Sequence, residues 1–252
     1  MAKVLLQGLT KRYGDVLAVN DLTLETRDRE FLVVVGPSGC GKTTTLRLIA
    51  GLERADRGQI YIDQECMNEV AVGRRGVQMI FQHYALWPHM KVMDDKKFTH
   101  LNFALKIRNW IDRDIRSRVG EITRRVGLES HLFSRKPHQL SDGQKQKVAI
   151  GRAIMIPPKV FLMDDPMTNI DPPGRIALRA EILKVHKQLQ TTTLYVTHNM
   201  ADAMAMADRI AVMREGSILQ VDSPEHLYTR PRNSFVADFI RSYDSSPAAR
   251  IR

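Results

Sequence analysis

Three short apolar runs stop abruptly at polar or glycine residues. They are FLVVV (31–35), VFLM (160–163) and TLYVT (193–197). Each has the length and the β-branched content of a strand buried on both faces, which predicts a parallel sheet covered by helices. Ligands of open α/β sheets bind at the carboxyl ends of the strands. We therefore expect a functional site where these three runs end.

A fourth pattern has a helical period. Apolar residues recur at steps of four, four, three and four, and four arginines lie off this stripe. The stripe consists of Ile111, Ile115, Val119, Ile122 and Val126. This spacing predicts an amphipathic helix whose apolar face packs on a core and whose arginines face solvent. We assign it no chemistry.

Composition limits what these elements can be. The chain has 252 residues, of which 43% are hydrophobic, enough for a sizeable core. The first residues turn polar too early for a signal peptide, and no apolar run reaches the length needed to cross a bilayer. The two cysteines, Cys40 and Cys66, are too few for a disulfide framework and lack metal-ligand spacing, which indicates a reducing, cytoplasmic setting.

The net charge by itself does not distinguish between functions. The formal net charge is +10 and the isoelectric point is about 9.8. These values are compatible with binding to nucleic acid, with an anionic membrane surface, or with a well-solvated surface alone.

The strongest motif follows the first apolar run. Residues 36–43 read GPSGCGKT and match the pattern G-x-x-x-x-G-K-[ST] between a strand and the helix pattern TTTLRLIAGLE. Backbone N–H groups of such a loop surround phosphate oxygens, aided by the helix N-terminus. The alternative is an ordinary glycine-rich turn. We expect nucleotide contacts from the whole loop, namely Gly36, Pro37, Ser38, Gly39, Cys40, Gly41, Lys42, Thr43 and Thr44.

Six motifs in order give the chain a resemblance to the ATP-binding-cassette (ABC) family, in particular to the ATPase subunits of sugar importers. LSDGQ (140–144) is similar to the signature motif, VFLMDDP (160–166) to the Walker B strand and TNID (168–171) to the D-loop. YVTHNM (195–200) resembles the switch-histidine loop. MIFQHYALWPHM (79–90) resembles the Q-loop, and the segment from 207 onward resembles the region after the switch histidine.

The resemblance implies an α/β fold of the P-loop NTPase class. Its RecA-like core has a parallel sheet, preceded by an N-terminal antiparallel β subdomain and interrupted by an inserted α-helical signature subdomain. The cassette domain would span residues 1–240, with the helical subdomain at about 84–150, and residues 241–252 would form a C-terminal tail. Sugar-importer ATPases usually continue into a regulatory β-barrel, and this sequence ends near where that barrel would begin.

The resemblance also implies ATP and Mg²⁺ as cofactors. Lys42 would reach the β and γ phosphates, and Thr43, Gln82 and Asp164 would bind the metal. Asp165, His198 and Gln82 are the implied catalytic residues. Tyr13 would stack on adenine. From residue type alone, Tyr13 could equally be a packing residue, Gln82 a surface glutamine and His198 a core histidine.

The signature implies a second cassette. In the family, two cassettes pair head to tail, so Ser141, Gly143 and Gln144 would contact the nucleotide held by a partner, in a homodimer. Transmembrane permease subunits would dock around the Q-loop, at Trp87, Pro88 and His89, and an extracytoplasmic solute-binding protein would act through them. The chain would then lie at the cytoplasmic face of the membrane, with no nucleic acid as partner.

Three departures from the family pattern affect this interpretation. Asp142 stands where the family has glycine, and Asp165 stands where it has the glutamate that orients the attacking water. The segment of residues 92–107 is longer than its counterpart in the family and lacks the usual Glu-Asn pair.

Two other classes therefore stay open. One is a nucleotide-binding regulator that hydrolyses ATP weakly, which the two aspartates favour. The other is a cassette that serves nucleic acid or the ribosome, which the charge would suit. The sequence lacks the long coiled coils of repair cassettes and the second cassette of ribosome-associated ones.

Overall fold

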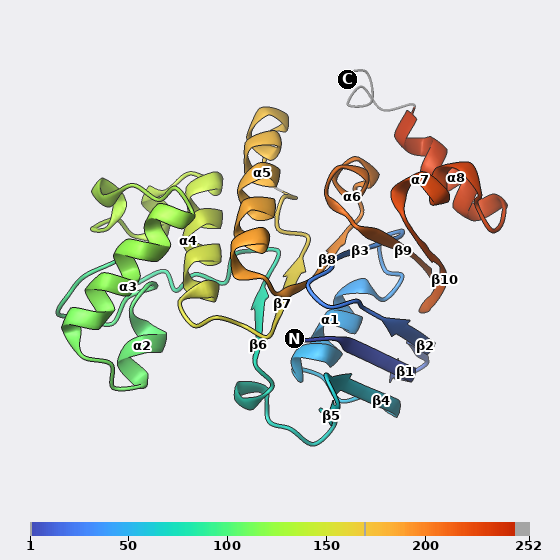
Figure 1. Cartoon of the computed structure of the whole chain (residues 1–252), viewed down its shortest axis with the longest axis horizontal. Coiled ribbons are helices and arrows are strands. Elements are labelled where there is room, and N and C mark those ends of the chain that lie inside the picture. The colour runs from blue at the N-terminus through green and yellow to red at the C-terminus, as the bar shows by residue number, and fades with distance from the viewer. Residues whose placement is uncertain (1, 169, 245–252) are drawn as a thin grey trace. The chain divides into compact units, whose positions relative to one another are not determined.

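The computed structural model describes residues 2–168 and 170–244 (Figure 1), so Asn169 of the D-loop motif and most of the expected tail lie outside the described residues. The chain divides into two compact units. The first contains residues 1–77, 159–165 and 190–252, and the second contains residues 78–158 and 166–189.

The first unit contains a four-stranded antiparallel sheet in the order β2-β1-β4-β5. Its strands are β1 (Val4–Tyr13), β2 (Val16–Glu25), β4 (Arg57–Ile62) and β5 (Glu65–Cys66). Buried positions alternate with exposed ones along much of β2 and β4, as in a sheet with one face on the core. This sheet confirms the expected N-terminal antiparallel part.

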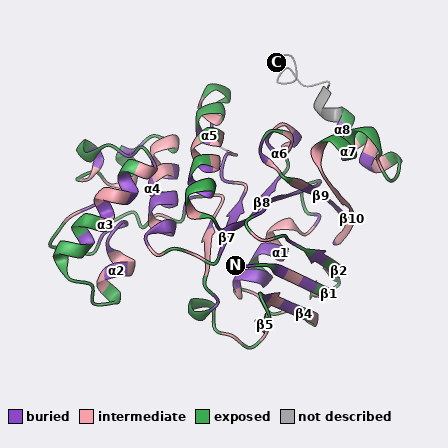
Figure 2. Ribbon diagram, in the orientation of Figure 1, coloured by how far each residue is buried: buried purple, intermediate pink, exposed green. Residues whose placement is uncertain are grey.

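The main sheet of this unit includes β10-β9-β3-β8-β7 in that order. These strands are β3 (Phe31–Val35), β7 (Val160–Asp164), β8 (Thr192–Thr197), β9 (Arg209–Arg214) and β10 (Ser217–Asp222). β3 runs parallel to β8 and β9, and β7 runs parallel to β8, whereas β10 pairs antiparallel with β9. Every residue of β3, β7 and β8 is buried, as the continuous apolar runs predict (Figure 2). The parallel core is confirmed.

Four helices accompany these sheets. They are α1 (Lys42–Ala50), α6 (Met200–Met206), α7 (Pro224–Thr229) and α8 (Ser234–Asp244). α1 packs against β7 and β8, and α6 packs against β3 and β8. α1 ends at Gly51, whose φ of 80° places it in the left-handed region that favours glycine. The side chain of Arg75 donates hydrogen bonds to the last carbonyls of α1 at Leu48 and Ile49, over 3.0 and 3.1 Å.

The second unit is mainly helical. Its helices are α2 (Phe103–Ile107), α3 (Asp112–Arg125), α4 (Asp142–Ile154) and α5 (Pro172–Leu189). β6 (Val77–Ile80) leads into it. Short 3-10 turns form at Ser130–Leu132 and Pro137–Gln139 in this unit, and at Val72–Arg74 in the first unit. The described residues contain no helix that is both long and apolar enough to span a membrane.

The amphipathic stripe is correct at four of its five positions. Ile115, Val119, Ile122 and Val126 are almost fully buried. Ile111 was wrongly included, because its side chain is 63% exposed. It precedes the helix as an N-cap with extended backbone, so its side chain does not follow the helical period.

Candidate functional site

The glycine-rich loop joins β3 to α1 in the first unit, and close backbone contacts require two of its glycines. A Cβ on Gly36 would lie 2.1 Å from the carbonyl oxygen of Met213, and one on Gly41 would lie 2.1 Å from that of Ala18. Gly41 also has a φ of 105°. The loop therefore follows a path that only glycine can take at these positions, and it ends at the N-terminus of α1.

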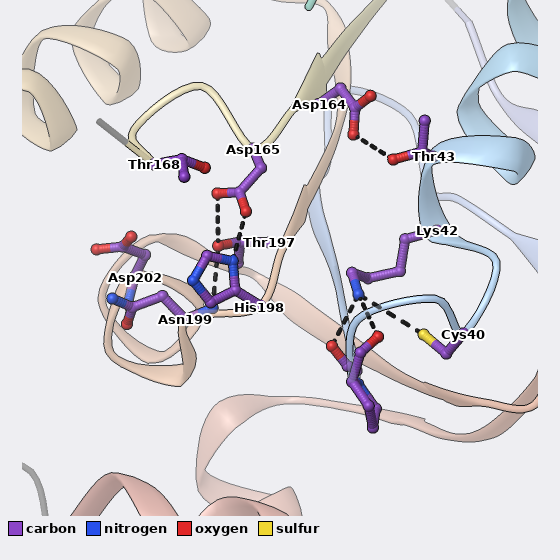
Figure 3. Close-up of polar contacts among 12 residues, drawn as sticks. Cys40, Lys42, Thr43, Asp164, Asp165, Thr168, Thr197, His198, Asn199 and Asp202 are labelled. Atoms are coloured by element: carbon purple, nitrogen blue, oxygen red, sulfur yellow. Dashed lines mark hydrogen bonds and ion pairs between the residues drawn. The ribbon is translucent and has the colours of Figure 1, made fainter. Parts of the chain in front are cut away.

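Lys42 folds back over this loop (Figure 3). Its ammonium donates to the carbonyl oxygens of Gly36 and Pro37, at 2.7 and 2.8 Å, and lies 3.6 Å from the sulfur of Cys40. The Cys40 side chain is buried beneath it. The only positive side chain within the glycine loop is thus held directly against the loop backbone.

Thr43 and Asp164 form an oxygen pair beside the loop. The Thr43 hydroxyl donates to a carboxylate oxygen of Asp164 over 2.8 Å (Figure 3). Asp164 ends β7 and is 6% exposed. Burial raises its pKa, and the nearby Asp165 adds to this, whereas the hydrogen bond from Thr43 opposes it.

This pair fits a magnesium ion. A hydroxyl and a carboxylate are the hard oxygen ligands that Mg²⁺ prefers, and a cation would offset the cost of burying the Asp164 charge. The described residues contain no group of three or more histidine, cysteine, aspartate or glutamate side chains that could hold a metal ion. Mg²⁺ usually keeps several waters and binds through one or two carboxylates plus substrate phosphates, so a partial set of this kind suits it.

Asp165 and His198 form a second pair at the neighbouring strand ends. The Nδ1 atom of His198 lies 2.5 Å from one carboxylate oxygen of Asp165, and the Thr197 hydroxyl donates to the other over 3.2 Å (Figure 3). Asp165 has a φ of 42°, in the left-handed region, so its backbone is strained where β7 ends. Thr197 also accepts a hydrogen bond from the Asn199 amide over 3.0 Å.

Tyr13 ends β1 in the same unit. Its side chain is 43% exposed, and the ammonium of Lys11 lies 5.2 Å from the ring centroid. An exposed ring at the end of a strand is available for stacking on a flat ligand.

The signature residues lie in the second unit, at the start of α4. Ser141 is the N-cap. Its hydroxyl accepts from the Gln144 amide over 3.3 Å, and its own amide donates to the Gln144 side chain over 3.0 Å. A Cβ on Gly143 would meet no atom within 4 Å, so its surroundings are open. Asp142 accepts a hydrogen bond from Lys145 over 2.9 Å, which offsets its charge within the helix itself.

The Q-loop residues lie after β6 in this unit. Gln82 is partly buried, and Trp87, Pro88 and His89 are exposed. A groove of about 380 Å³ adjoins Trp87. Its lining is largely apolar and includes Met79, Phe81, Trp87, Phe103, Arg152 and Ile156.

Comparison with known sequences decides the family. The profile described as "ABC transporter" matches residues 19–168. The chain belongs to the ABC transporter family. The osmoprotective compounds uptake ATP-binding protein GgtA of Synechocystis is 50% identical over 96% of this ABC chain. The trehalose/maltose import ATP-binding protein MalK of Thermococcus litoralis is 48% identical over 96%. The chain spans 65% of the length of each of these two relatives.

Solved structures agree with the fold. The dimeric ATP-binding cassette MJ0796 bound to ADP and Pi is 27% identical, with a TM-score of 0.76 over 88% of this ABC chain and 98% of that one. The cbiO1 structure from Clostridium perfringens is 24% identical, with a TM-score of 0.80 over 90% of each chain, and supports the fold alone. The P-loop NTPase fold of the ABC type is confirmed.

Two features of the site are not visible as motifs. Thr197 precedes His198 and donates to Asp165, although in the sequence it is simply the last residue of a strand rich in β-branched side chains. Lys145 follows the signature motif at the i,i+3 spacing that lets it pair with Asp142. That spacing is a signal in the sequence that could have identified the pair.

Proposed function

We propose that this ABC chain is the ATP-binding and ATP-hydrolysing subunit of an importer for sugars or related small solutes. One observation carries the proposal. A single compact unit contains the glycine loop with Lys42, the Thr43–Asp164 pair and the Asp165–His198 pair, at the ends of neighbouring strands. Relatives named for uptake of osmoprotective compounds and for trehalose/maltose import support the solute class.

The loop would bind the phosphates of ATP. Backbone N–H groups of residues 36–44 and the N-terminus of α1 offer positive partial charges, and Lys42 adds a full charge by exchanging its carbonyl partners for phosphate oxygens. Tyr13 would stack on the adenine ring. Thr43 and Asp164, with Gln82 as a further ligand, would hold Mg²⁺, which neutralises phosphate charge when bound.

Asp165 and His198 would act at the γ-phosphate. The Asp165 carboxylate would accept a hydrogen bond from the attacking water and so orient it. His198 would hold Asp165 through Nδ1 and leave its other ring nitrogen, Nε2, to face the phosphate. Thr197 fixes the second carboxylate oxygen, so the side chain keeps one orientation. Gln82 would contact the same water through its amide.

The second unit would serve partners. Ser141, Gly143 and Gln144 would contact the γ-phosphate held by a second copy of the chain, so that ATP joins two cassettes. A permease would dock at the groove beside Trp87, Pro88 and His89, and a solute-binding protein would act through that permease. The domain from residue 1 to 240 would thus work at the cytoplasmic face of a membrane.

Substitution of Lys42 tests the nucleotide site. Lys42→Ala removes the cation that the loop backbone holds, so we expect ATP affinity to fall by about a hundredfold, since hydrogen bonds to charged groups are worth up to about 3 kcal/mol. Binding of a fluorescent ATP analogue to the purified chain, with and without Mg²⁺, measures it. Lys3→Ala, which removes an exposed lysine of the same unit, is the control. Unchanged affinity in Lys42→Ala would contradict the proposal.

A weakly hydrolysing regulator is the second candidate, and Asp165 favours it. An aspartate is one methylene shorter than glutamate, and here both of its oxygens are occupied by Thr197 and His198. Steady-state ATP turnover compared with ATP binding separates the two candidates. Binding without turnover, even with the permease present, would favour the regulator.

A further inference from the structure

Arg152, in the last turn of α4, contacts residues 82–87, in which a turn at residues 82–85 is followed by Trp87; this segment is called the Trp87 turn below. Its guanidinium donates to the carbonyl oxygens of Ala85 and Tyr84, at 2.5 and 3.0 Å. Tyr84 and Ala85 both have positive φ angles, 60° and 46°, which non-glycine residues seldom adopt. Two donors from one planar group therefore hold a strained backbone turn in place.

The same guanidinium also contacts the Trp87 ring, with its central carbon 5.2 Å from the ring centroid. His100 lies nearly parallel to that ring at 5.7 Å, and Phe103 lies tilted against it at 5.0 Å. These contacts leave the indole 36% exposed, with Trp87, Phe103 and Arg152 all lining the groove. The position of one groove wall is thus set by Arg152 and its neighbours.

His100 is suited to this arrangement because it is neutral. Its side chain is 1% exposed, and burial together with the charge of Arg152 lowers its pKa to about 4. No ring nitrogen of His100 has a partner of good hydrogen-bond geometry among the described residues. The ring therefore stacks on Trp87 without placing a second positive charge beside Arg152.

The other end of α4 carries the signature motif. Ser141 caps the helix and Arg152 lies in its last turn. At 1.5 Å per residue, the 13 residues of α4 span about 20 Å. Residues 146 and 148–151 are buried along it, so the helix is fixed within its unit over most of its length. A displacement at the capped end would be transmitted along the helix to Arg152.

We propose that Arg152 is a positioning residue that couples the signature end of α4 to the Trp87 turn, so that the groove wall changes when a nucleotide engages the signature. The proposal rests on the proposed function, in which the signature contacts ATP and the groove receives the permease. In this proposal, Arg152 determines how the groove wall responds to nucleotide at the signature. A guanidinium is required because it alone combines two parallel donors with a flat face for the indole.

Trp87 itself reports on the coupling. The chain has two tryptophans, so a Trp110→Phe background leaves Trp87 as the sole emitter. In that background we expect ATP, added to the chain at concentrations where two copies associate, to shift the Trp87 emission. Arg152→Met should abolish the ATP-linked shift while ATP still binds. Arg152→Lys, which keeps the charge and loses the paired donors, should retain only part of the shift.

Arg118→Met is the matched control. Arg118 donates to the carbonyls of Ile154 and Met155, at 2.9 and 3.0 Å, so it holds the same end of α4. Its hydrogen bonds among the described residues go to Ile154, Met155 and Glu121, all outside the Trp87 turn. This variant should destabilise the helix end to a similar degree and keep the ATP-linked shift. A loss of the shift in Arg118→Met equal to that in Arg152→Met would reduce Arg152 to a structural clamp and overturn the proposal.

A second readout uses the permease in vesicles. Arg152→Met should weaken cassette binding to those vesicles about tenfold, a loss of about 1.4 kcal/mol, because the groove wall is no longer held in position, and Arg118→Met should not. A wild type that binds ATP but shows a silent Trp87 would overturn the inference alone. A wild type that fails to bind ATP would contradict the proposed function instead.

Discussion

The two units each bury an ionisable side chain, and they use it differently. In the first unit, Asp164 is 6% exposed, burial raises its pKa, and its carboxylate accepts a hydrogen bond from Thr43. In the second unit, His100 is 1% exposed and is surrounded by the rings of Trp87 and the charge of Arg152. Burial raises the pKa of the acid and lowers that of the base, so in both cases it disfavours the charged form.

The difference lies in what each site offers a ligand. Asp164 keeps polar partners that a bound cation can join. Binding of the cation therefore offsets the free-energy cost of burying the Asp164 carboxylate. Neither ring nitrogen of His100 makes a hydrogen bond of good geometry to a described residue, and the ring serves as a flat, neutral surface. Burial of a titratable group therefore marks a binding site only where other polar groups converge on it. The three predictions below concern charged or titratable groups of the two units, from the largest expected effect to the smallest.

The pH dependence of stability tests the neutral state of His100. Its pKa of about 4 is well below the usual 6.5, so between pH 6.5 and 4 the unfolded chain binds a proton that the folded chain does not. The contribution of neutral His100 to the free energy of unfolding is complete above about pH 6.5. It decreases as the pH falls towards 4, by about 3 kcal/mol in total. Denaturant unfolding at several pH values measures this slope.

His100→Phe is the matched variant, because it keeps a ring against Trp87 and removes the titration. It should unfold with a flatter pH dependence than the wild type over this range, whereas replacement of the exposed His131 serves as the control. Identical slopes in His100→Phe and in the wild type would show that His100 takes up its proton equally in the folded chain.

Much of the first unit is predictable because its determinants are local in sequence. The runs that form β3, β7 and β8 are rich in apolar and β-branched residues, since both faces are buried, and the candidate site residues stand at or directly after the end of each run. Gly41 and Gly51 are equally local in that each has a positive φ, whereas Gly36 is required by the carbonyl of Met213, far away in sequence.

The second unit is less predictable because its contacts are distant in sequence. Arg152 reaches carbonyls 67 and 68 residues away, in a turn that requires positive φ at Tyr84 and Ala85. No hydrophobic period indicates such a turn. The exposure of Ile111 arises similarly, because the helix begins one residue later than the apolar pattern suggests.

Asp165 offers a second test, this time within the first unit. Asp165→Glu moves the carboxylate outward by about one C–C bond, roughly 1.5 Å, and so away from the position that Thr197 and His198 now hold. Misplacement on the order of 1 Å can cost about a hundredfold in rate, so we expect ATP turnover to rise by up to that factor with ATP affinity unchanged. Steady-state ATPase at saturating ATP measures it.

The ion pair between Asp142 and Lys145 limits how far Asp142 can slow ATP turnover. Because Lys145 already pairs with Asp142, adding Asp142→Gly to Asp165→Glu should raise turnover only slightly further. Asp165→Asn, which keeps the size and removes the charge, is the control and should be slower than the wild type. A wild type as fast as the double variant would show that Thr197 and His198 seat the shorter side chain productively.

The smallest effect concerns Lys145 alone. Lys145→Ala leaves the Asp142 charge, whose side chain is 47% exposed, uncompensated beside Ser141 and Gly143. If these residues meet the phosphates of a partner's ATP, like-charge repulsion should weaken ATP-dependent dimerisation. An exposed pair is worth at most about 1 kcal/mol, so the loss should be about fivefold or less. It should shrink as salt is raised from 0.01 to 0.15 M, because the Debye length falls from about 30 to about 8 Å.

Sedimentation at several ATP and salt concentrations measures this loss, and Lys147→Ala is the control. Lys147 lies on the same helix but pairs with Glu181 at 2.8 Å, so its removal leaves the charge of Asp142 compensated. Asp142→Gly should abolish the effect of Lys145→Ala, since no carboxylate would then need compensation. A weakening that persists in the Asp142→Gly background, or one that does not respond to salt, would mean that Lys145 itself contacts the partner. Asp142 would then contribute nothing at the signature.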